Sequence, residues 1–501
     1  MCAQVLSAVL QDNKQLINDK LNHSIDLVER SFKLDGGVDI SVFYMSGVTD
    51  ATAVHEYVIK PLITATLPQN QVKKNNGQEK QSDTIDYILK NVLWTSEVKV
   101  ESSLDDIAKM IIYGDCAVLI DGEASAICAA HKKWDKRSIS EPPTSAVLKG
   151  PREGFTEDMK SNTVQLRRRL RSPDLIFEQM QVGRYTNTNI SVAYIKGIAD
   201  ENIVKKIVER IKAIDIDGII DSFYVQQFLE ERRGSIFKQI NSSEKPDIVA
   251  ARMLEGRIAV IVDGSPVVLT LPYMLLEDFQ NSQDYYTRRD ESTLRIFLRV
   301  SAYLIGLLLP AFYVAVEVYH YDILPIKMLI TLSNAIHGTP FPPLQEMLLV
   351  TIIFMLIYDA SVMMPRYVGM AVSIVGALVL GDTAVKAGII SSPTVLVVAI
   401  SMLASQLAPE QVGLSGVLKL GFILAGGLMG VFGMIAGLVL LLAYMAGLDS
   451  YGTPFLAPFS PFIKKDMKDA LFKQGAADME TRPYSIPGQN KTRMKKEESR
   501  K

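Results

Sequence analysis

Cysteine and histidine are scarce in this chain, which has three cysteines and five histidines among 501 residues. The cysteines, Cys2, Cys116 and Cys128, have no ligand-like spacing and are too few for a disulfide framework, so reduced thiols are expected. No histidine stands in a HExxH-type or other paired-ligand pattern. The sequence therefore predicts neither a metal site nor a cofactor.

Motifs of nucleotide binding and catalysis are also missing. No glycine-rich loop ends in Gly-Lys-Ser or Gly-Lys-Thr, and residues 150–154 are interrupted by proline and charged side chains. Ser265 follows a turn without the pattern of a nucleophile elbow, and no pair of carboxylates indicates acid–base chemistry. We therefore expect a protein that is not an enzyme.

A cleavable signal is absent too, because Asp12 and Lys14 interrupt the weakly apolar start of the chain. The N-terminal half is therefore expected to stay in the cytosol. The basic run Arg167-Arg168-Arg169 lacks interleaved aromatic residues, which argues against a nucleic-acid surface. A solvated connector or a surface for an acidic partner is the better interpretation, and no nucleic acid is expected.

Charge becomes rare from Ser301 to Ser460, where Leu, Ile, Val, Ala, Met and Gly dominate. A membrane-spanning helix needs about 20 apolar residues, and this region supplies several such runs. Clear spans are expected at 296–319, 344–364 and 367–389, a short one at 394–408, a long Gly-rich one at 414–447, and a re-entrant or interfacial segment at 323–338. The region is thus predicted to lie in a lipid bilayer.

The flanks of this apolar region are basic. Arginines crowd the start of the first apolar run, and the tail after Pro461 is rich in lysine and arginine. By the positive-inside rule both termini are cytosolic, which requires an even number of crossings. We expect four full crossings plus re-entrant or partial helices, with six crossings as the alternative.

Charged residues inside the apolar region are candidates for function, because a charge in lipid is costly unless it faces protein or water. Glu317, Glu346, Asp359 and Lys386 qualify by position, together with Asp382. For each of them, an interfacial side chain that snorkels to water is the alternative interpretation.

The polar half contains an internal repeat. Residues 42–50 and, about 150 residues later, residues 192–200 share Tyr, Gly and Asp without a gap. Residues 114–122 match residues 256–264 in the same way, and each block ends in an Asp-Gly turn typical of a hairpin. Each first block is expected to be a strand followed by a helix with its Asp as N-cap, so the sequence predicts two related α/β subdomains.

The expected fold class is an α/β soluble N-terminal region of two related subdomains, followed by an all-α multi-span membrane domain. The expected domains are an N-terminal helical extension (1–37), a first α/β subdomain (38–130), a basic connector (131–187), a second α/β subdomain (188–290), a transmembrane domain (291–460) and a basic cytosolic tail (461–501).

Several long strings in fixed order resemble the A subunits of GerA-type spore germinant receptors, and the resemblance covers most of the chain from residue 40 to 465. The motif positions are Gly150, Pro151, Arg152, Glu153, Gly154, Phe155, Arg168, Asp263 and Gly264. Further strings are Asp284-Tyr285-Tyr286, Pro340-Phe341-Pro342 with Glu346, and residues 449–454.

This resemblance implies a subunit in the inner membrane of bacterial endospores that assembles with a transporter-like B subunit and a lipoprotein C subunit. It implies that copies of the chain form a homo-oligomeric cation channel, whose opening starts germination after the partners sense a nutrient. A sporulation-stage paralogue of the same family is the alternative. A secondary transporter is less favoured, because the apolar region shows no pair of repeated halves, and a passive scaffold would not need the intramembrane acids.

We expect the span around residues 373–381 to line the pore. Its small residues allow close helix approach, and its branched apolar residues suit a constriction that gates by dewetting. Asp382 at its end would repeat as a ring of carboxylates in an oligomer, which favours cations. The predicted pore-lining residues are Val375, Leu378, Val379 and Asp382. An ordinary packing helix is the alternative.

Overall fold

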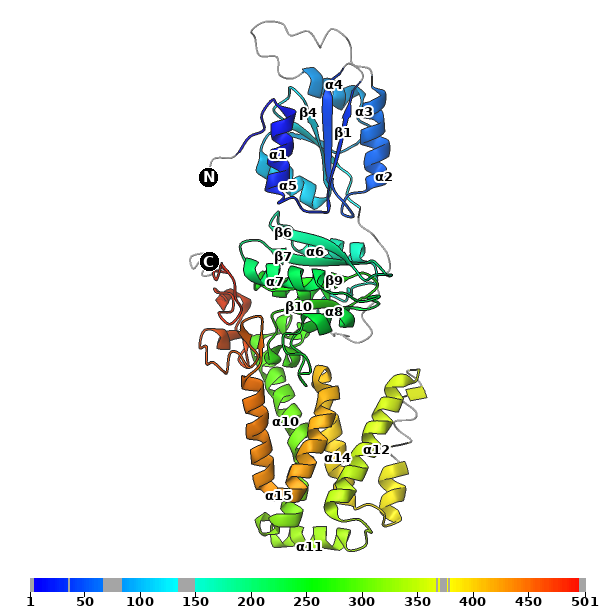
Figure 1. Cartoon of the computed structure of the whole chain (residues 1–501), viewed down its shortest axis with the longest axis vertical. Coiled ribbons are helices and arrows are strands. Elements are labelled where there is room, and N and C mark those ends of the chain that lie inside the picture. Colours follow the sequence, from blue (N-terminus) through cyan, green and yellow to red (C-terminus); the bar gives the residue numbers. More distant parts are fainter. Residues whose placement is uncertain are drawn as a thin grey trace. The chain divides into compact units, whose positions relative to one another are not determined.

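The computed structural model describes residues 4–34, 37–65, 83–133, 149–365, 368–369, 376 and 379–494. The chain forms two compact units. The first unit comprises residues 1–233, 240–272 and 480–501, and the second comprises residues 234–239 and 273–479. Within the first unit, two α/β subdomains follow each other along the chain (Figure 1).

The first subdomain is a five-stranded antiparallel sheet of order β1-β2-β4-β5-β3 with helices on both faces. Its elements are α1 (Leu10–Lys20), β1 (Leu27–Lys33), β2 (Asp39–Met45), α2 (Ala51–Val54), η1 (His55–Ile59), α3 (Lys60–Thr64), α4 (Asp83–Asn91), β3 (Val98–Glu101), α5 (Leu104–Tyr113), β4 (Asp115–Ile120) and β5 (Ala126–Ala130). Alternate residues of β2 and β4 enter two separate cores: Phe43 and Leu119 pack with α1 and α5, while Val42 and Val118 pack with α2 to α4. This period-two burial on both faces makes the sheet the middle of three layers.

The second subdomain repeats this plan with the sheet order β6-β7-β9-β10-β8. Its elements are α6 (Met159–Arg169), β6 (Leu175–Val182), β7 (Thr188–Ile195), α7 (Glu201–Lys212), α8 (Ser222–Leu229), β8 (Asn241–Ser243), α9 (Pro246–Leu254), β9 (Ile258–Val262) and β10 (Val268–Leu271). α6 and α9 pack on one face of the sheet. The predicted fold class of two related α/β subdomains is confirmed.

The repeated residues hold the same topological positions. Tyr44 on β2 pairs with the second residue of β1, and Tyr194 on β7 pairs with the second residue of β6. Asp121 and Asp263 directly follow β4 and β9, and their backbone N–H groups donate to the neighbouring strand, to Asp39 O near the start of β2 and to Asn189 O near the start of β7. The predicted equivalence of both pairs is therefore confirmed.

The predicted N-caps are confirmed as well. The Asp50 carboxylate accepts from the N–H groups of Thr52 and Ala53 at the start of α2. The Asp200 carboxylate accepts from the N–H of Asn202 at the start of α7, at 2.8 Å. Each carboxylate satisfies N–H groups that have no partner inside the helix.

Each repeat begins earlier than the matching strings in the sequence. In the first, the amide of Asn13 donates to Ser7 O and accepts from Ser7 N; in the second, Asn162 makes the same two bonds to Thr156. α1 and β1 lie before residue 38, and α6 and β6 lie before residue 188. The two sheets therefore each include a strand from a segment that the sequence did not assign to them: β1 from the expected extension (1–37) and β6 from the expected connector (131–187).

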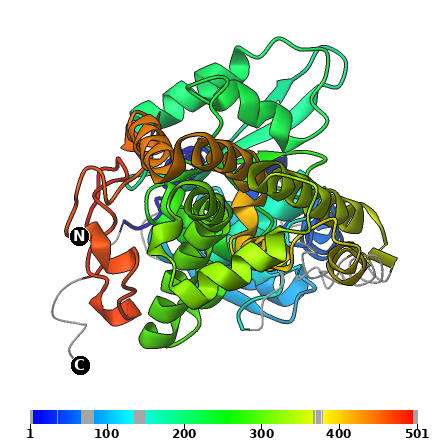
Figure 2. The same cartoon turned by 90° about the horizontal axis from the view of Figure 1, so that it is seen from below.

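The second unit is helical. Its elements are η3 (Leu275–Phe279), η4 (Ser282–Tyr285), α10 (Arg289–Tyr319), η5 (Tyr321–Ile323), α11 (Ile326–Ile336), α12 (Pro343–Met363), η6 (Val379–Ala384), α14 (Ser392–Ser405), η7 (Pro409–Gln411), α15 (Val412–Ala446), β11 (Asp449–Ser450), β12 (Thr453–Pro454), η8 (Asp466–Asp469) and η9 (Ala476–Asp478). Among the described residues, three helices are long and apolar enough to cross a membrane, namely α10, α12 and the stretch from Pro409 to Ala446. α11 lies crosswise to α10, as Figures 1 and 2 both show.

α15 is two helices joined at Gly430, whose φ of 63° and ψ of −151° are not helical. Near this glycine, the Tyr319 hydroxyl at the end of α10 donates to Leu428 O at 2.8 Å. The two outer ends of α15 instead reach one common apolar cluster, which contains Leu414 and Met445. The chain therefore turns back at Gly430, and Figure 1 shows the two limbs running side by side.

Close packing holds α10 against the first limb of α15. A Cβ added at Gly426 would lie 2.7 Å from the carbonyl oxygen of Ala311, so only glycine permits this approach. Outward-facing positions of α15 are apolar too, as the exposed side chains of Leu428, Phe432 and Leu440 show. A helix that is apolar on all sides is typical of a membrane span.

Candidate functional site

Glu346 is a buried acid at the first turn of α12. Its Oε1 accepts from the backbone N–H of Ser391 at 2.8 Å and from the Ser391 hydroxyl at 2.7 Å. Ser391 is the N-cap residue of α14. A carboxylate at a helix N-terminus is stabilised by the N–H groups and the helix dipole, so this contact fixes α12 to the start of α14.

Glu317 lies near the end of α10 and is half-buried. Its Oε2 is buried and has no hydrogen-bond partner within the residues that the structure describes. A buried carboxylate oxygen without a donor is costly, which distinguishes Glu317 from the satisfied Glu346.

The predicted pore segment is described only in part. Val375 and Leu378 lie outside the described residues. Val379 begins η6, a single π-helical turn, and Asp382 lies within it. Asp382 pairs with Lys386 one turn later at 2.7 Å, and both side chains are largely exposed. The carboxylate at the end of the predicted pore span therefore already has a counter-charge in one copy of the chain.

Lys419 is a functional candidate that the sequence reasoning missed. It lies on the first limb of α15, is 2 % exposed, and its ammonium donates to Ser405 Oγ at 3.2 Å and to Met402 Sδ at 3.6 Å. No carboxylate pairs with it in the described part of the chain. One signal was available, because Lys419 is the sole charged residue between positions 412 and 446.

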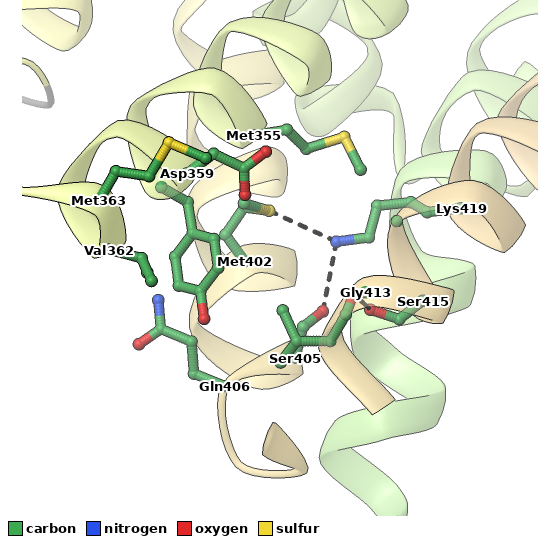
Figure 3. Close-up of a pocket in the computed structure, with 13 residues that line it drawn as sticks. Met355, Asp359, Val362, Met363, Met402, Ser405, Gln406, Gly413, Ser415 and Lys419 are labelled. Carbon is green, nitrogen blue, oxygen red and sulfur yellow. Dashed lines mark hydrogen bonds between the residues drawn. The ribbon is translucent and has the colours of Figure 1, made fainter. Parts of the chain in front are cut away.

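A cavity of about 360 Å³ lies beside Lys419, between α12, α14 and α15 (Figure 3). The predicted intramembrane acid Asp359 lines it from α12, opposite Lys419. Met355, Met402 and Met363 supply apolar wall, and Gln406 and Ser415 supply further polar groups. The structure thus brings one predicted residue, Asp359, together with one that was overlooked.

Two polar clusters lie before α10 and α15. In the first, buried Asp278 accepts from the Tyr273 hydroxyl at 2.7 Å and from Gln411 Nε2 at 2.5 Å, and it pairs with Lys238 at 2.9 Å. Lys238 also pairs with Glu410 at 2.9 Å. Although burial works against its charged form, the carboxylates of Asp278 and Glu410 hold the pKa of Lys238 above its ordinary value. This cluster ties the start of α15 to residues 238 and 273–278.

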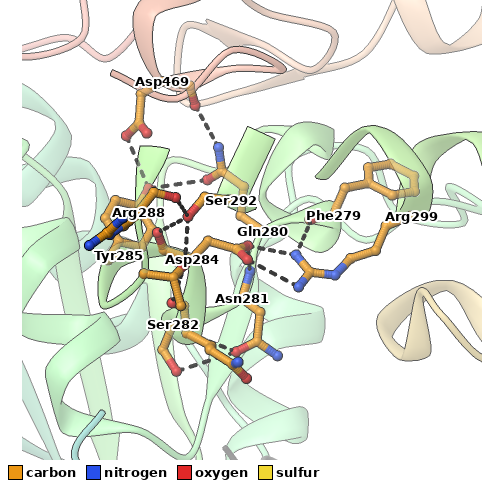
Figure 4. Close-up of polar contacts among 12 residues, drawn as sticks. Phe279, Gln280, Asn281, Ser282, Asp284, Tyr285, Arg288, Ser292, Arg299 and Asp469 are labelled. Carbon is orange, nitrogen blue, oxygen red and sulfur yellow. Dashed lines mark hydrogen bonds and ion pairs between the residues drawn. The ribbon is translucent and has the colours of Figure 1, made fainter. Parts of the chain in front are cut away.

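The second cluster centres on Asp284, in the string that the family resemblance quoted (Figure 4). Its carboxylate accepts two hydrogen bonds, of 2.6 and 3.1 Å, from the two terminal guanidinium nitrogens of Arg299 in α10. The Tyr285 hydroxyl donates to Asp469 at 3.0 Å, and Gln280 donates to Asp469 O at 2.6 Å. Arg299 lies ten residues after the first residue of α10, and it therefore makes a bidentate structural contact in addition to being a basic residue at the start of the apolar run.

Several motif positions of the first unit make contacts within that unit. Glu153 pairs with both Arg168 and Arg169, Gly154 O accepts from Gln165, and the backbone N–H of buried Phe155 donates to Glu244 O at 2.8 Å. Asp263 Oδ1 accepts from the N–H of Met159, and Gly264 N–H donates to Glu157 O. The glycine and proline at 150–151 and Arg152 lead into this segment.

The described residues offer neither a cluster of metal ligands nor a reactive thiol. Within the described ranges, no three His, Cys, Asp or Glu side chains gather in a way that could hold a metal ion. Cys116 and Cys128 are buried on neighbouring strands, and burial raises the pKa of each thiol to about 12. Such thiols are protonated and unreactive at neutral pH.

Comparison with known proteins gives a consistent result. The family model described as Bacillus/Clostridium GerA spore germination protein matches residues 15–485. Spore germination protein KA of Bacillus subtilis (strain 168) is 36% identical over 498 residues, which cover 99% of this chain and 90% of that protein. Spore germination protein GerLA of Bacillus cereus is 31% identical over 484 residues, covering 96% of each.

A solved structure is also similar. The N-terminal domain of the A subunit of the Bacillus megaterium spore germinant receptor GerK3 is 30% identical, with a TM-score of 0.42. The match covers 54% of this chain and 97% of that one.

Proposed function

Because the chain belongs to the GerA spore germination protein family, we propose that it is the A subunit of a nutrient germinant receptor in the inner membrane of bacterial spores. In this role it assembles with a transporter-like B subunit and a lipoprotein C subunit, which sense the nutrient. Copies of the chain form a cation channel that opens to start germination. The family match over residues 15–485 is the observation that carries this proposal.

The helical unit supports a role within the membrane rather than an enzymatic one. Its helices are apolar towards the core and outwards, and they enclose Glu317, Glu346 and Lys419. Interior ionisable groups of this kind mark ion pathways or structural contacts in membrane proteins. Glu346 has a structural contact, while Glu317 and Lys419 have no opposite charge among the described residues.

The turn at Gly430 favours six passages over four. We assign one each to α10, α12, α14 and the span expected at 367–389, and two to the limbs of α15. With 14 residues, α14 is about 21 Å long, shorter than a full crossing of about 30 Å. An even number leaves both termini in the cytosol.

Labelling tests this arrangement. In a cysteine-free background and in oriented vesicles, Met429→Cys beside the turn should react with an impermeant reagent from the outer side only. Asp466→Cys in the tail should react from the cytosolic side only. Reaction of both from the same side would contradict six passages.

Cation flux tests the channel. The purified receptor, reconstituted in vesicles, should release cations on addition of nutrient. Because Lys386 neutralises Asp382, Lys386→Gln should raise cation flux and Asp382→Asn should lower it, while Lys327→Gln on exposed α11 serves as the matched control. Val379→Ala should make the channel leak before nutrient is added. A receptor of verified assembly with unchanged flux in all these variants would place the pore elsewhere.

A further inference from the structure

The cavity beside Lys419 carries an inference that goes beyond the channel proposal and depends only on membrane insertion. A lysine that is 98 % buried, without a carboxylate partner in the described part of the chain, points its ammonium into a space of about 360 Å³. Burying an unpaired charge is costly, so a bound anionic group is the natural complement. Ser405 Oγ accepts from this ammonium at 3.2 Å and donates to Ser401 O at 2.9 Å, so it holds the lysine in place and leaves the ammonium's remaining N–H donors for an anion.

The opposite wall carries the opposite charge. Asp359 lines the cavity from α12 and has no ion-pair partner among the described residues. Figure 3 shows the Asp359 carboxylate and the Lys419 ammonium directed into the same space from two different helices. A small anion alone would satisfy Lys419 and be repelled by Asp359. A group with a negative and a positive end fits both walls.

The depth of the cavity indicates where such a group comes from. Lys419 is seven residues after the start of α15, which is about 10 Å along the helix axis. That depth corresponds to the boundary between lipid head groups and hydrocarbon when the helix starts at the membrane surface. The α12 side of the cavity ends in Val362 and Met363, which are strongly exposed apolar side chains and thus suited to contact lipid tails.

We propose that this cavity binds the head group of an aminophospholipid, with the phosphate on Lys419 and the primary ammonium on Asp359. A lipid held in this way would link α12 to α14 and α15. It would make the packing of these helices depend on the composition of the surrounding membrane.

The test measures lipid selectivity of the full chain. Protein in nanodiscs of equal parts phosphatidylethanolamine and phosphatidylcholine is extracted gently, and the retained lipid is identified by native mass spectrometry. The wild type should retain phosphatidylethanolamine over phosphatidylcholine by about tenfold, the equivalent of one charge-assisted hydrogen bond. Discs that contain phosphatidylglycerol, which has the phosphate but no ammonium, should give weaker retention.

Single substitutions separate the two ends of the site. Lys419→Gln should abolish retention of all three lipids, whereas Lys419→Arg should preserve it and shows that the fold survives a change at this buried position. Asp359→Asn, at an exposed position, should leave phosphate-dependent retention but remove the preference for the primary amine. Lys327→Gln, at an exposed lysine of α11 that does not line the cavity, is the matched control and should leave lipid retention unchanged.

Two results would overturn the proposal. One is that Lys419→Gln retains each lipid as strongly as the wild type does. The other is saturable binding of soluble phosphoethanolamine or glycine in detergent without any lipid selectivity, which would make the cavity a site for a free zwitterion. Neither result bears on cation flux, which is measured separately and decides the channel proposal.

Discussion

The two α/β repeats have the same strand order and the same buried asparagine contact, yet they differ in one charge. Ser24 and Asp26 precede β1, and Ser172 and Asp174 precede β6 at the equivalent place, each serine bonding to its aspartate. Asp26 also receives a bidentate contact from Arg167 of α6, with two bonds of 3.0 Å. Within the described residues, no basic side chain pairs with Asp174.

Arg167 breaks the symmetry because it belongs to one repeat and binds the other. The position equivalent to Arg167 in α1 is Asn18, whose side chain donates to Lys14 O and to the Glu29 carboxylate, both within the first repeat. The guanidinium of Arg167 is buried and fully used, since it also donates to Ser24 and to the carbonyls of Ser172 and Leu175. The two folds are thus similar, and the buried ion pair between them requires an arginine that is present in only one.

The largest expected effect comes from removing that contact. Arg167→Met keeps much of the side-chain volume but leaves Asp26 without a counter-charge and removes the guanidinium donor from the carbonyls of Ser172 and Leu175. Breaking a buried ion pair costs about 3–5 kcal/mol, and the partial exposure of Asp26 places the loss at the lower end. Hydrogen–deuterium exchange of the purified chain should show the loss as faster opening of β1 and β6.

The control is an exposed pair of the same type. Arg184→Met removes a bidentate contact to Asp215 on the surface, where solvent screens the two charges and the pair contributes little to stability. If Arg167→Met were no more destabilising than Arg184→Met, Arg167 would not be what joins the repeats.

A second, smaller effect tests the likeness of the repeats. Asn13→Ala and Asn162→Ala each remove two hydrogen bonds to the backbone N–H and C=O of one residue, with an expected loss of about 1–3 kcal/mol. The two losses should agree, since both asparagines are fully buried. Exposed Asn202→Ala is the control. Local opening of α1 and α6, measured by the same exchange experiment, would differ clearly if the two contacts were not equivalent.

The sequence predicted the repeats because their signals are local. Strands with period-two apolar residues, Asp N-caps and Asp-Gly turns act over a few residues, so their positions can be derived without the fold. The equal spacing of Ser7 with Asn13 and of Thr156 with Asn162 is a weaker signal of the same repeat. Arg167 was interpreted as one of three surface arginines, because only the fold brings Asp26 to it.

The helical unit was harder to predict for a physical reason. Residues 412–446 are almost uniformly apolar and contain eight glycines, and nothing local distinguishes Gly430 from the other seven. The break is set by tertiary contacts, such as those of Leu428 with Tyr319 and Val431 with His320. The cavity at Lys419 depends in turn on that fold, since three separate helices line it.

A third prediction concerns the Asp-Gly turns. Asp121 Oδ1 accepts from the first N–H of α1, residue Leu10, at 3.1 Å, and Asp263 Oδ1 accepts from Met159 of α6 at 3.2 Å. Replacing either aspartate by alanine removes a cap supplied from a distant turn, at a cost of about 1 kcal/mol. Asp121→Asn and Asp263→Asn keep the acceptor and should cost less. Equal losses for the Ala and Asn variants, measured by urea unfolding, would show that the carboxylate charge matters and the hydrogen bond does not.

The smallest effect separates the repeats by pH. Asp158 caps α6 through the N–H of Ser161 at 2.9 Å, whereas Val9 at the same place in α1 makes no side-chain cap. Although burial works to raise it, hydrogen bonds from Ser161 and the backbone hold the pKa of Asp158 below its ordinary value. The contribution of this cap to stability is therefore complete above the unfolded pKa of about 3.9, and it is lost as pH falls through the lower folded pKa.

The loss, at most about 1 kcal/mol, should appear in the hydrogen–deuterium exchange of α6 and not of α1, once intrinsic exchange rates are normalised. Asp158→Asn keeps a capping oxygen that does not titrate, so the acid-dependent difference between α6 and α1 should disappear in this variant. Its persistence would mean that another group, not the cap, makes the second repeat sensitive to acid.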